Sequence, residues 1–128
     1  MAVIWPKTRS VAHKYGGKKF SIEQRLTFGP GGKFAMTNED GAAYEKAILR
    51  AKRAGLDLPS PNMIKFIRKK ALRLTQREMA KLVGGGERSF QKYESGYSLP
   101  SRAVSNLLKL LNHDPELVEV LQQTSWPH

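Results

Sequence analysis

Cysteine is absent from this chain of 128 residues. Its absence excludes disulfide bonds, a thiol nucleophile and any thiolate-bound zinc or iron–sulfur site. Long hydrophobic runs are also missing: no stretch approaches the roughly 18 apolar residues of a membrane span, and residues 1–10 lack the apolar core of a secretory signal. We therefore expect a soluble, cytoplasmic protein that uses no cofactor and contacts no membrane.

Acidic residues are scarce as well. The chain has 22 Lys and Arg against 11 Asp and Glu, which gives a net charge of +11 with neutral histidines. Residues 1–60 carry 11 basic and 5 acidic side chains, and residues 61–128 carry 11 and 6, so both halves share the excess. This charge favours nucleic acid as a partner, because Lys and Arg displace its condensed counterions. A basic surface also serves solubility or attracts anionic lipid.

Two prolines, Pro59 and Pro61, mark a boundary, because each fixes its own φ and disfavours helix at the residue before it. We predict a small α+β region over residues 1–58 and a helical domain over residues 59–128. The expected fold class is therefore mainly α. Apolar residues make up 40% of the chain, which is enough to fill such a core.

Glycine pairs predict turns in the amino-terminal region. Gly16-Gly17 separates residues 11–15 from residues 18–22, the pattern of a β-hairpin. The Gly-Pro-Gly-Gly stretch at residues 29–32 predicts a second turn, followed by another strand near residues 34–36.

Capping residues and apolar spacing predict the helices. Thr37 suits the N-cap of a helix that Gly55 would end in the left-handed conformation. Thr75 and Glu78 form a capping box, and Asp114 is placed to cap the last helix. After the boundary we expect five helices, at about residues 61–74, 75–83, 87–94, 101–111 and 114–122.

A capped helix, a glycine-bearing break and a second short helix form the layout of a helix-turn-helix, whose second helix enters the DNA major groove. The strings Thr75–Gly84 and Phe90–Gly96 resemble the Cro and phage-repressor type of this motif. In that family, a Gln starts the first helix of the pair, a small residue packs at the crossing, a Gly makes the turn, and Tyr-Glu-x-Gly closes the second helix. The matching residues here are Gln76, Ala80, Gly84 and Tyr93-Glu94-Ser95-Gly96.

A closer resemblance covers residues 68–121 and is carried by Arg68–Leu72, the triple glycine at residues 84–86, Phe90, Tyr93–Gly96 and His113–Leu117. This stretch resembles the DNA-binding half of MqsA-type antitoxins. The resemblance implies a homodimer that binds the promoter of its own toxin–antitoxin operon. It also implies an amino-terminal half that holds zinc and binds a ribonuclease toxin.

The amino-terminal half departs from that family at the zinc site. Gly29 and Gly32 stand where the resemblance would place two cysteine ligands, and His13, His113 and His128 are scattered along the chain. A tetrahedral zinc site needs about four nitrogen or sulfur donors. We therefore predict no structural zinc, which leaves toxin binding by this half an open question.

Exposed polar residues around the predicted turn are the candidates for DNA contact. Arg88 has the geometry to donate two bonds to guanine, and its neighbours on the same helix face complete the candidates for base contact, which are Glu87, Arg88, Gln91 and Lys92. Glu87 is also placed to cap the helix, and Phe90 is assigned to the core. The candidates for phosphate contact are Gln76, Arg77, Ser89, Tyr93, Lys69, Lys70, Arg73 and Arg102, although solvated charges are the alternative for the last four.

Operator reading predicts a dimer, because one short helix covers few base pairs and two copies about 34 Å apart read two half-sites of a palindrome. We expect Leu110, Val118, Leu121 and Trp126 to form the dimer interface, with an ordinary intramolecular core as the alternative. Residues 1–58 would extend the DNA footprint through Lys7, Arg9, Lys14, Lys18 and Lys19.

The sequence thus favours a DNA-binding repressor that resembles an antitoxin. The alternatives are a stand-alone or prophage regulator without a toxin, and a basic RNA-binding protein that stacks bases on Tyr15, Phe20, Phe28 and Phe34. A catalytic role is disfavoured, since the sequence offers no Ser/His/Asp grouping and no carboxylate pair suited to a pocket.

Overall fold

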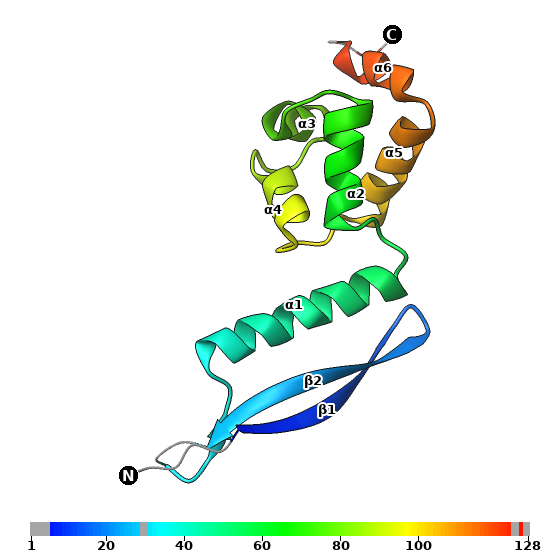
Figure 1. Ribbon diagram of the computed structural model, residues 1–128. Coiled ribbons are helices and arrows are strands. Elements are labelled where there is room, and N and C mark those ends of the chain that lie inside the picture. Colours follow the sequence, from blue (N-terminus) through cyan, green and yellow to red (C-terminus); the bar gives the residue numbers. More distant parts are fainter. Residues whose placement is uncertain (1–5, 29–30, 124–125, 127–128) are drawn as a thin grey trace. The chain divides into compact units, whose positions relative to one another are not determined.

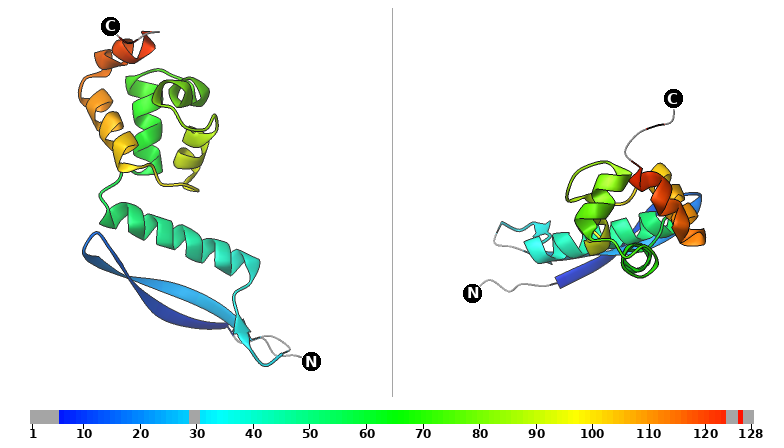
Figure 2. Two further views of the ribbon diagram at one scale, coloured as in Figure 1. Left: turned by 180° about the vertical axis from the view of Figure 1, so that it is seen from behind. Right: turned by 90° about the horizontal axis from the view of Figure 1, so that it is seen from above.

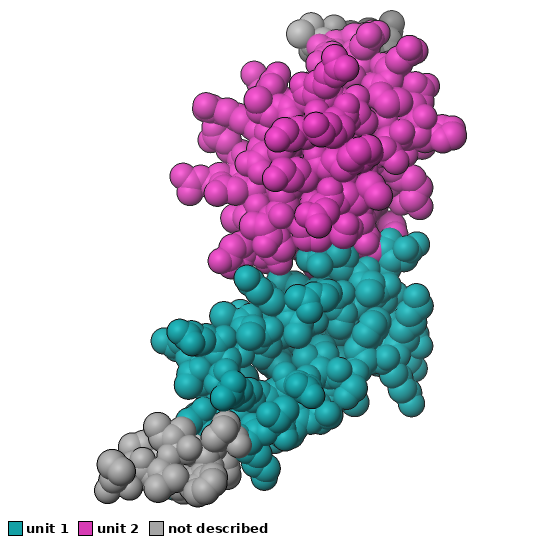
Figure 3. Space-filling model, viewed as in Figure 1, with its two compact units in different colours: residues 1–57 teal, residues 58–128 magenta. Residues whose placement is uncertain are grey.

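The computed structural model describes residues 6–28, 31–123 and 126. The chain divides into two compact units, residues 1–57 and residues 58–128 (Figure 3). The fold is mainly α, as predicted, with a small antiparallel sheet in the first unit. No helix in the described ranges is long and apolar enough to cross a membrane.

The first unit begins with the predicted hairpin. Strands β1 (Pro6–Tyr15) and β2 (Lys18–Phe28) pair antiparallel, with Val11 opposite Ile22. Gly16 and Gly17 have φ of 58° and 79°, a backbone that glycine adopts without strain and that matches the twist of a two-residue hairpin. The hairpin prediction is confirmed, and both strands extend well beyond the predicted residues.

A third short strand follows the second glycine stretch. Strand β3 (Phe34–Ala35) pairs antiparallel with β2 through Ala35 opposite Thr27 and Phe34 opposite Phe28, so the sheet order is β1-β2-β3. The predicted extra strand is therefore confirmed as a two-residue element. Part of the turn, residues 29–30, lies outside the described residues.

Helix α1 (Asn38–Gly55) runs along one face of this sheet (Figure 1). Thr37 caps it as predicted, because its hydroxyl accepts a hydrogen bond from the Asp40 amide at 3.1 Å. Alternate residues of the hairpin face the helix. Ile22 of β2 and Ala51 of α1 are the most deeply buried apolar side chains among the described residues of the first unit, at 7% exposed each.

The expected role of Gly55 is wrong. Gly55 is the last residue of α1, and the left-handed backbone falls on Asp57, whose φ is 55°. A Cβ on Gly55 would instead collide with the backbone carbonyl of Tyr15, and one on Gly16 would collide with the carbonyl of Gly55. Glycine is required at both positions because the hairpin turn and the helix end touch through their backbones.

The regular elements in the described part of the second unit are all helices or short helical turns (Figure 2). The predicted helix at 61–74 is shorter, because α2 (Pro61–Phe66) continues into one π-helical turn, η1 (Ile67–Ala71), and Arg73 then adopts a left-handed φ of 56°. The other predicted helices are found within a few residues of their expected bounds: α3 (Gln76–Val83), α4 (Ser89–Ser95), α5 (Arg102–His113) and α6 (Val118–Gln122).

Local capping explains most of these boundaries. Thr75 and Glu78 form the predicted capping box, with both hydrogen bonds at 3.1 Å, and Gly96 ends α4 with a left-handed φ of 84°. The expectation that Asp114 caps the last helix is wrong. Its side chain makes no capping hydrogen bond, and the 3-10 turn η2 (Pro115–Leu117) precedes α6 there.

One apolar cluster joins the helices of the second unit. Phe90, Ile64, Met79, Leu108 and Leu111 are each at most 1% exposed, and they come from α4, α2, α3 and α5. The assignment of Phe90 to the core is confirmed. Because α4 is held through this buried ring, the opposite face of the helix, with Gln91 and Lys92, is left for the surface.

Candidate nucleic-acid interface

Helices α3 and α4 are joined by the triple glycine, and two of its residues have conformations that favour glycine. Gly84 ends α3 with a φ of 90°, and Gly85 follows with a φ of 93°. Side chains with a Cβ rarely adopt these values, so the glycines permit an abrupt change of direction before α4 begins. The glycine run that the sequence marks is therefore the joint of the candidate site.

A buried ion pair between Arg68 and Glu94 stabilises this joint. The Arg68 guanidinium donates from Nε to Glu94 Oε2 at 2.7 Å and from Nη2 to Glu94 Oε1 at 2.8 Å. Its Nη1 donates to the Leu74 carbonyl at 2.7 Å. The two side chains are 10% and 5% exposed, and the hydrogen bonds with Glu94 raise the pKa of Arg68 despite its burial. The pair therefore ties η1 to the carboxyl end of α4.

Gln76 joins the same network. Its Nε2 donates to Glu94 Oε1 at 3.2 Å, so three side chains from η1, α3 and α4 meet at one carboxylate. The prediction placed Gln76 on a DNA phosphate, whereas the structure directs its amide nitrogen into the α3–α4 junction. Its Oε1 has no donor capacity toward a phosphate, so any phosphate contact has to come from the remaining amide proton or the backbone.

Sequence reasoning missed the role of Arg68. The available signal is that Arg68 follows Ile64 by four residues and so continues the buried stripe of that helix. An arginine in an apolar stripe needs an internal partner, because an unpaired buried charge is costly. The sequence does not say that the partner is Glu94, which lies 26 residues away.

Arg77 and Glu87 form a second ion pair, at the surface. Arg77 Nη2 lies 2.7 Å from Glu87 Oε1, and the side chains are 82% and 66% exposed. These residues were predicted to contact a phosphate and a base separately. The structure pairs them with each other across the glycine joint, so a DNA contact by either has to compete with an exposed ion pair of about 0.2–1 kcal/mol.

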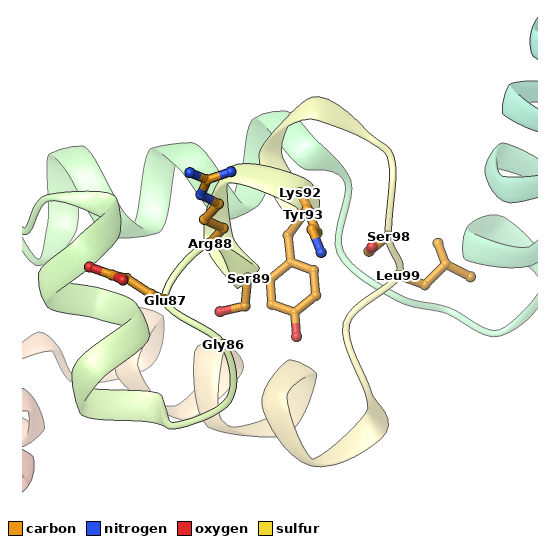
Figure 4. Close-up of a pocket in the computed structure, with 8 residues that line it drawn as sticks. All are labelled: Gly86, Glu87, Arg88, Ser89, Lys92, Tyr93, Ser98 and Leu99. Carbon is orange, nitrogen blue, oxygen red and sulfur yellow. The ribbon is translucent and has the colours of Figure 1, made fainter.

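The amino-terminal part of α4 borders an open depression of about 510 Å³ (Figure 4). Arg88 and Lys92 lie four residues apart, are both exposed and border this depression, and Gln91 is exposed beside them. In Figure 4 the Arg88 side chain extends to the opposite side from the Ser89 hydroxyl and the Tyr93 ring. The residues that line the depression are Gly86, Glu87, Arg88, Ser89, Lys92, Tyr93, Ser98 and Leu99.

Two of the predicted phosphate contacts lie on the inner side of α4. The Tyr93 ring packs edge-on against Phe90, with ring centroids 5.3 Å apart, and is half-buried. The Ser89 Oγ is buried and has no hydrogen-bond partner among the described residues. A buried hydroxyl without a hydrogen-bond partner lowers the stability of the fold, so the placement of the Ser89 hydroxyl, unlike that of the Tyr93 ring, is unfavourable.

Four further basic residues predicted to contact phosphates are exposed elsewhere on the second unit. Lys69 and Lys70 lie on the exposed side of η1, Arg73 follows them, and Arg102 is exposed in the first turn of α5. All four retain the surface positions that a phosphate contact needs.

The predicted dimer residues fall into two groups. Leu110 is 58% exposed and Trp126 is 84% exposed, whereas Val118 and Leu121 are half-buried and pack on the unit's own core. Val120, which sequence reasoning did not select, is 58% exposed. The exposed apolar surface near the carboxyl terminus therefore includes Val120 but neither Val118 nor Leu121.

In the first unit, the basic residues predicted to contact DNA lie in different environments. Lys14 and Lys19 are exposed and directly opposite each other in the hairpin, while Arg9 donates to Gln24 at 2.7 Å. Tyr15 and Phe20 are half-buried with ring centroids 6.2 Å apart, so they are not open stacking faces for bases. The side chains of Phe28 and Phe34 lie outside the described residues.

Comparison with known proteins places the chain among the antitoxins of bacterial toxin–antitoxin systems. A family described as the antitoxin component of a bacterial toxin–antitoxin system, MqsA, matches residues 2–122, so the chain belongs to the MqsA antitoxin family. The antitoxin MqsA of Escherichia coli (strain K12) is 35% identical over 89 residues. That alignment covers 68% of this chain and 66% of the E. coli protein.

The residues present do not fit the zinc that the resemblance implies for the amino-terminal half. The chain has no cysteine, and its described residues contain no group of three or more His, Asp and Glu that could hold a metal ion. His13 is engaged otherwise, since its Nε2 lies 2.9 Å from the Tyr44 hydroxyl and its Nδ1 lies 3.1 Å from the Tyr15 hydroxyl. Aromatic and hydrogen-bonded contacts therefore hold α1 to the sheet in this protein.

Proposed function

We propose that this antitoxin is a sequence-specific DNA-binding repressor in which α3 and α4 form a helix-turn-helix. The observation that carries the proposal is the α3–glycine–α4 joint, fixed by Arg68 and Glu94, with Arg88 exposed at the N-cap of α4 and Gln91 and Lys92 exposed on the helix. Arg88 and Gln91 supply the donor and acceptor groups that read base edges in the major groove. The exposed lysines and arginines of this unit supply the sequence-independent attraction to phosphates.

A dimer completes this function. Two α4 helices about 34 Å apart would read the two halves of a palindromic operator upstream of the protein's own gene. The exposed Leu110, Val120 and Trp126 supply apolar surface for the contact between copies. The antitoxin would thereby repress its own operon in the cytoplasm.

A toxin is the second partner. Membership in the antitoxin family supports a cognate toxin, and the resemblance assigns toxin binding to the amino-terminal half and ribonuclease activity to the toxin. The first unit here keeps a hairpin packed on a helix without cysteine ligands. Toxin binding would therefore depend on a protein surface that forms without metal.

The test of the DNA proposal compares two duplexes and two variants of Arg88. Purified protein is titrated by fluorescence anisotropy into the DNA upstream of its own gene and into a scrambled duplex, at physiological salt. We expect a preference of about 10³ or more for the upstream DNA. Arg88→Ala should lose specific binding by about 1–3 kcal/mol, whereas the charge-preserving Arg88→Lys should keep part of it, because a lysine ammonium can also reach guanine O6 and N7 but lacks the planar fork of arginine.

Equal, salt-sensitive binding to both duplexes would show that the positive charge acts without operator recognition. Retention of full preference in Arg88→Ala would remove Arg88 from base readout while leaving the repressor proposal intact.

A further inference from the structure

Strand β2 has an outer edge that is largely unpaired. β2 pairs with β1 along nearly its whole length, but β3 pairs only with Thr27 and Phe28 on the other side. Within the described part of this unit, no strand pairs with the outer edge of residues 18–26. An unpaired edge exposes backbone N–H and C=O groups that can hydrogen-bond another extended chain.

The register identifies the residues that carry these groups. In a two-residue hairpin, the residues that flank the turn form a hydrogen-bonded pair, which here is Tyr15 with Lys18. Hydrogen-bonded pairs then recur at every second residue, so the even-numbered residues of β2 bond to β1. The odd-numbered residues therefore direct their backbone groups to the outer edge. The unpaired members are Lys19, Ser21, Glu23 and Arg25.

A groove accompanies this edge. It has a volume of about 360 Å³ and lies between β2 and α1. Its helix wall is formed by three alanines, which leave room for larger side chains, together with the exposed Arg50. The residues that line the groove are Phe20, Ser21, Ile22 and Glu23 of β2 and Ala47, Arg50, Ala51 and Ala54 of α1.

We propose that the outer edge of β2 receives an extended strand of the toxin. Every second side chain of the added strand would be apolar and enter the groove, as in other cases of strand addition to a sheet edge. The proposal rests on the antitoxin function and names the surface and the binding mode that serve it.

Charge specifies the partner strand further. Lys19 and Arg25 lie on the exposed face of the sheet beside the edge, and Arg50 borders the groove, against the single acid Glu23. A partner strand with acidic side chains opposite Lys19 and Arg25 would gain from these cross-strand pairs. A second copy of β2 has the same excess of basic side chains, so its net charge opposes self-pairing.

The test uses two pairs of matched variants and, as probe, the protein encoded by the gene next to this one. Ser21→Pro removes an N–H from the outer edge without touching the β1 ladder. Ala12→Pro does the same on the outer edge of β1, directly opposite Ser21. Lys19→Glu reverses a charge beside the β2 edge, and Lys14→Glu reverses its cross-strand neighbour. Binding is measured by isothermal titration on full-length protein, with circular dichroism to check folding.

We expect Ser21→Pro and Lys19→Glu each to weaken binding at least tenfold, while Ala12→Pro and Lys14→Glu bind within about twofold of the wild type. Wild-type affinity in a folded Ser21→Pro together with Lys19→Glu would overturn the proposal, as would a loss confined to the β1 variants. Loss of self-association in Ser21→Pro without loss of toxin binding would assign the edge to a second copy instead. Failure of the wild type to bind the neighbouring gene product would refute the toxin partner itself, whereas the edge variants test only the surface.

Discussion

Replacing Arg68 by Met tests how much the α3–α4 joint depends on one buried ion pair. The guanidinium makes two hydrogen bonds to Glu94, at 2.7 and 2.8 Å, and one to the Leu74 carbonyl, and the paired side chains are at most 10% exposed. Removal of one partner leaves the Glu94 carboxylate buried without its counter-charge. Breaking such a pair costs about 3–5 kcal/mol.

This loss is a large fraction of the roughly 5–15 kcal/mol that stabilises a typical domain. With a urea m-value of about 2 kcal/mol/M, the unfolding midpoint of the helical unit should fall by roughly 2 M, as followed by far-ultraviolet circular dichroism. Arg68→Met combined with Glu94→Leu should recover much of the loss, because an apolar pair avoids the desolvation of both charges. DNA binding measured on the folded fraction should still be weaker in the double variant, since Gln76 loses its partner on α4.

Two outcomes would refute this reasoning. The first is a loss below about 1 kcal/mol in Arg68→Met, which would mean that water or another group replaces the guanidinium. The second is strict additivity of the two single variants, because residues that form one hydrogen-bonded network show coupling of about 0.5–3 kcal/mol.

Three further predictions concern the helices and the hairpin. Gly55→Ala should destabilise the first unit by about 1–3 kcal/mol, because its Cβ meets the Tyr15 backbone, whereas Gly41→Ala, in open space on the same helix, should stabilise it by up to about 1 kcal/mol; equal thermal midpoints would contradict this. Hydrogen bonds with Thr75 lower the pKa of Glu78. The stabilisation by the Glu78 carboxylate should therefore be full above the ordinary Glu pKa and disappear as the pH falls through the lowered pKa of the folded state. Glu78→Gln should abolish this contribution to the difference in unfolding free energy between urea titrations at pH 7 and pH 3. Leu110→Asp should shift the sedimentation mass from dimer to monomer with little loss of stability, whereas Val118→Ala, at the core, should destabilise the unit by about 0.5–3 kcal/mol; a dimeric Leu110→Asp would place the interface elsewhere.

The elements that sequence reasoning placed well are those whose causes are local. Gly16-Gly17 sets the hairpin turn, the hydroxyl of Thr75 caps α3 through an amide three residues away, and Gly96 ends α4. Each depends on the backbone preferences of one or two neighbouring residues. The burial of Phe90 was likewise predictable, because its place on the helix opposes the polar face.

The candidate site was predictable in composition but not in its pairings. Arg88, Gln91 and Lys92 are exposed as expected, because a helix has a fixed spacing of side chains. Arg77 and Glu87, assigned to separate contacts, form an ion pair across the glycine joint. The π-helical turn at residues 67–71 was also missed, since its period departs from the ordinary helical repeat by which sequences are interpreted.

The mainly α class, the hairpin, the order of the helices, the basic character and the resemblance to the antitoxin family all follow from the amino-acid sequence, because they depend on composition and on contacts between near neighbours. The pairing of Arg68 with Glu94, the backbone contact of Gly55 with Tyr15 and the unpaired outer edge of β2 within the described residues emerge only when the chain is folded. The physical reason is distance along the chain. The two contacts join segments far apart in sequence, and the free edge depends on which segments pack beside it. Only the packing of the whole unit selects which of many compatible partners comes within reach.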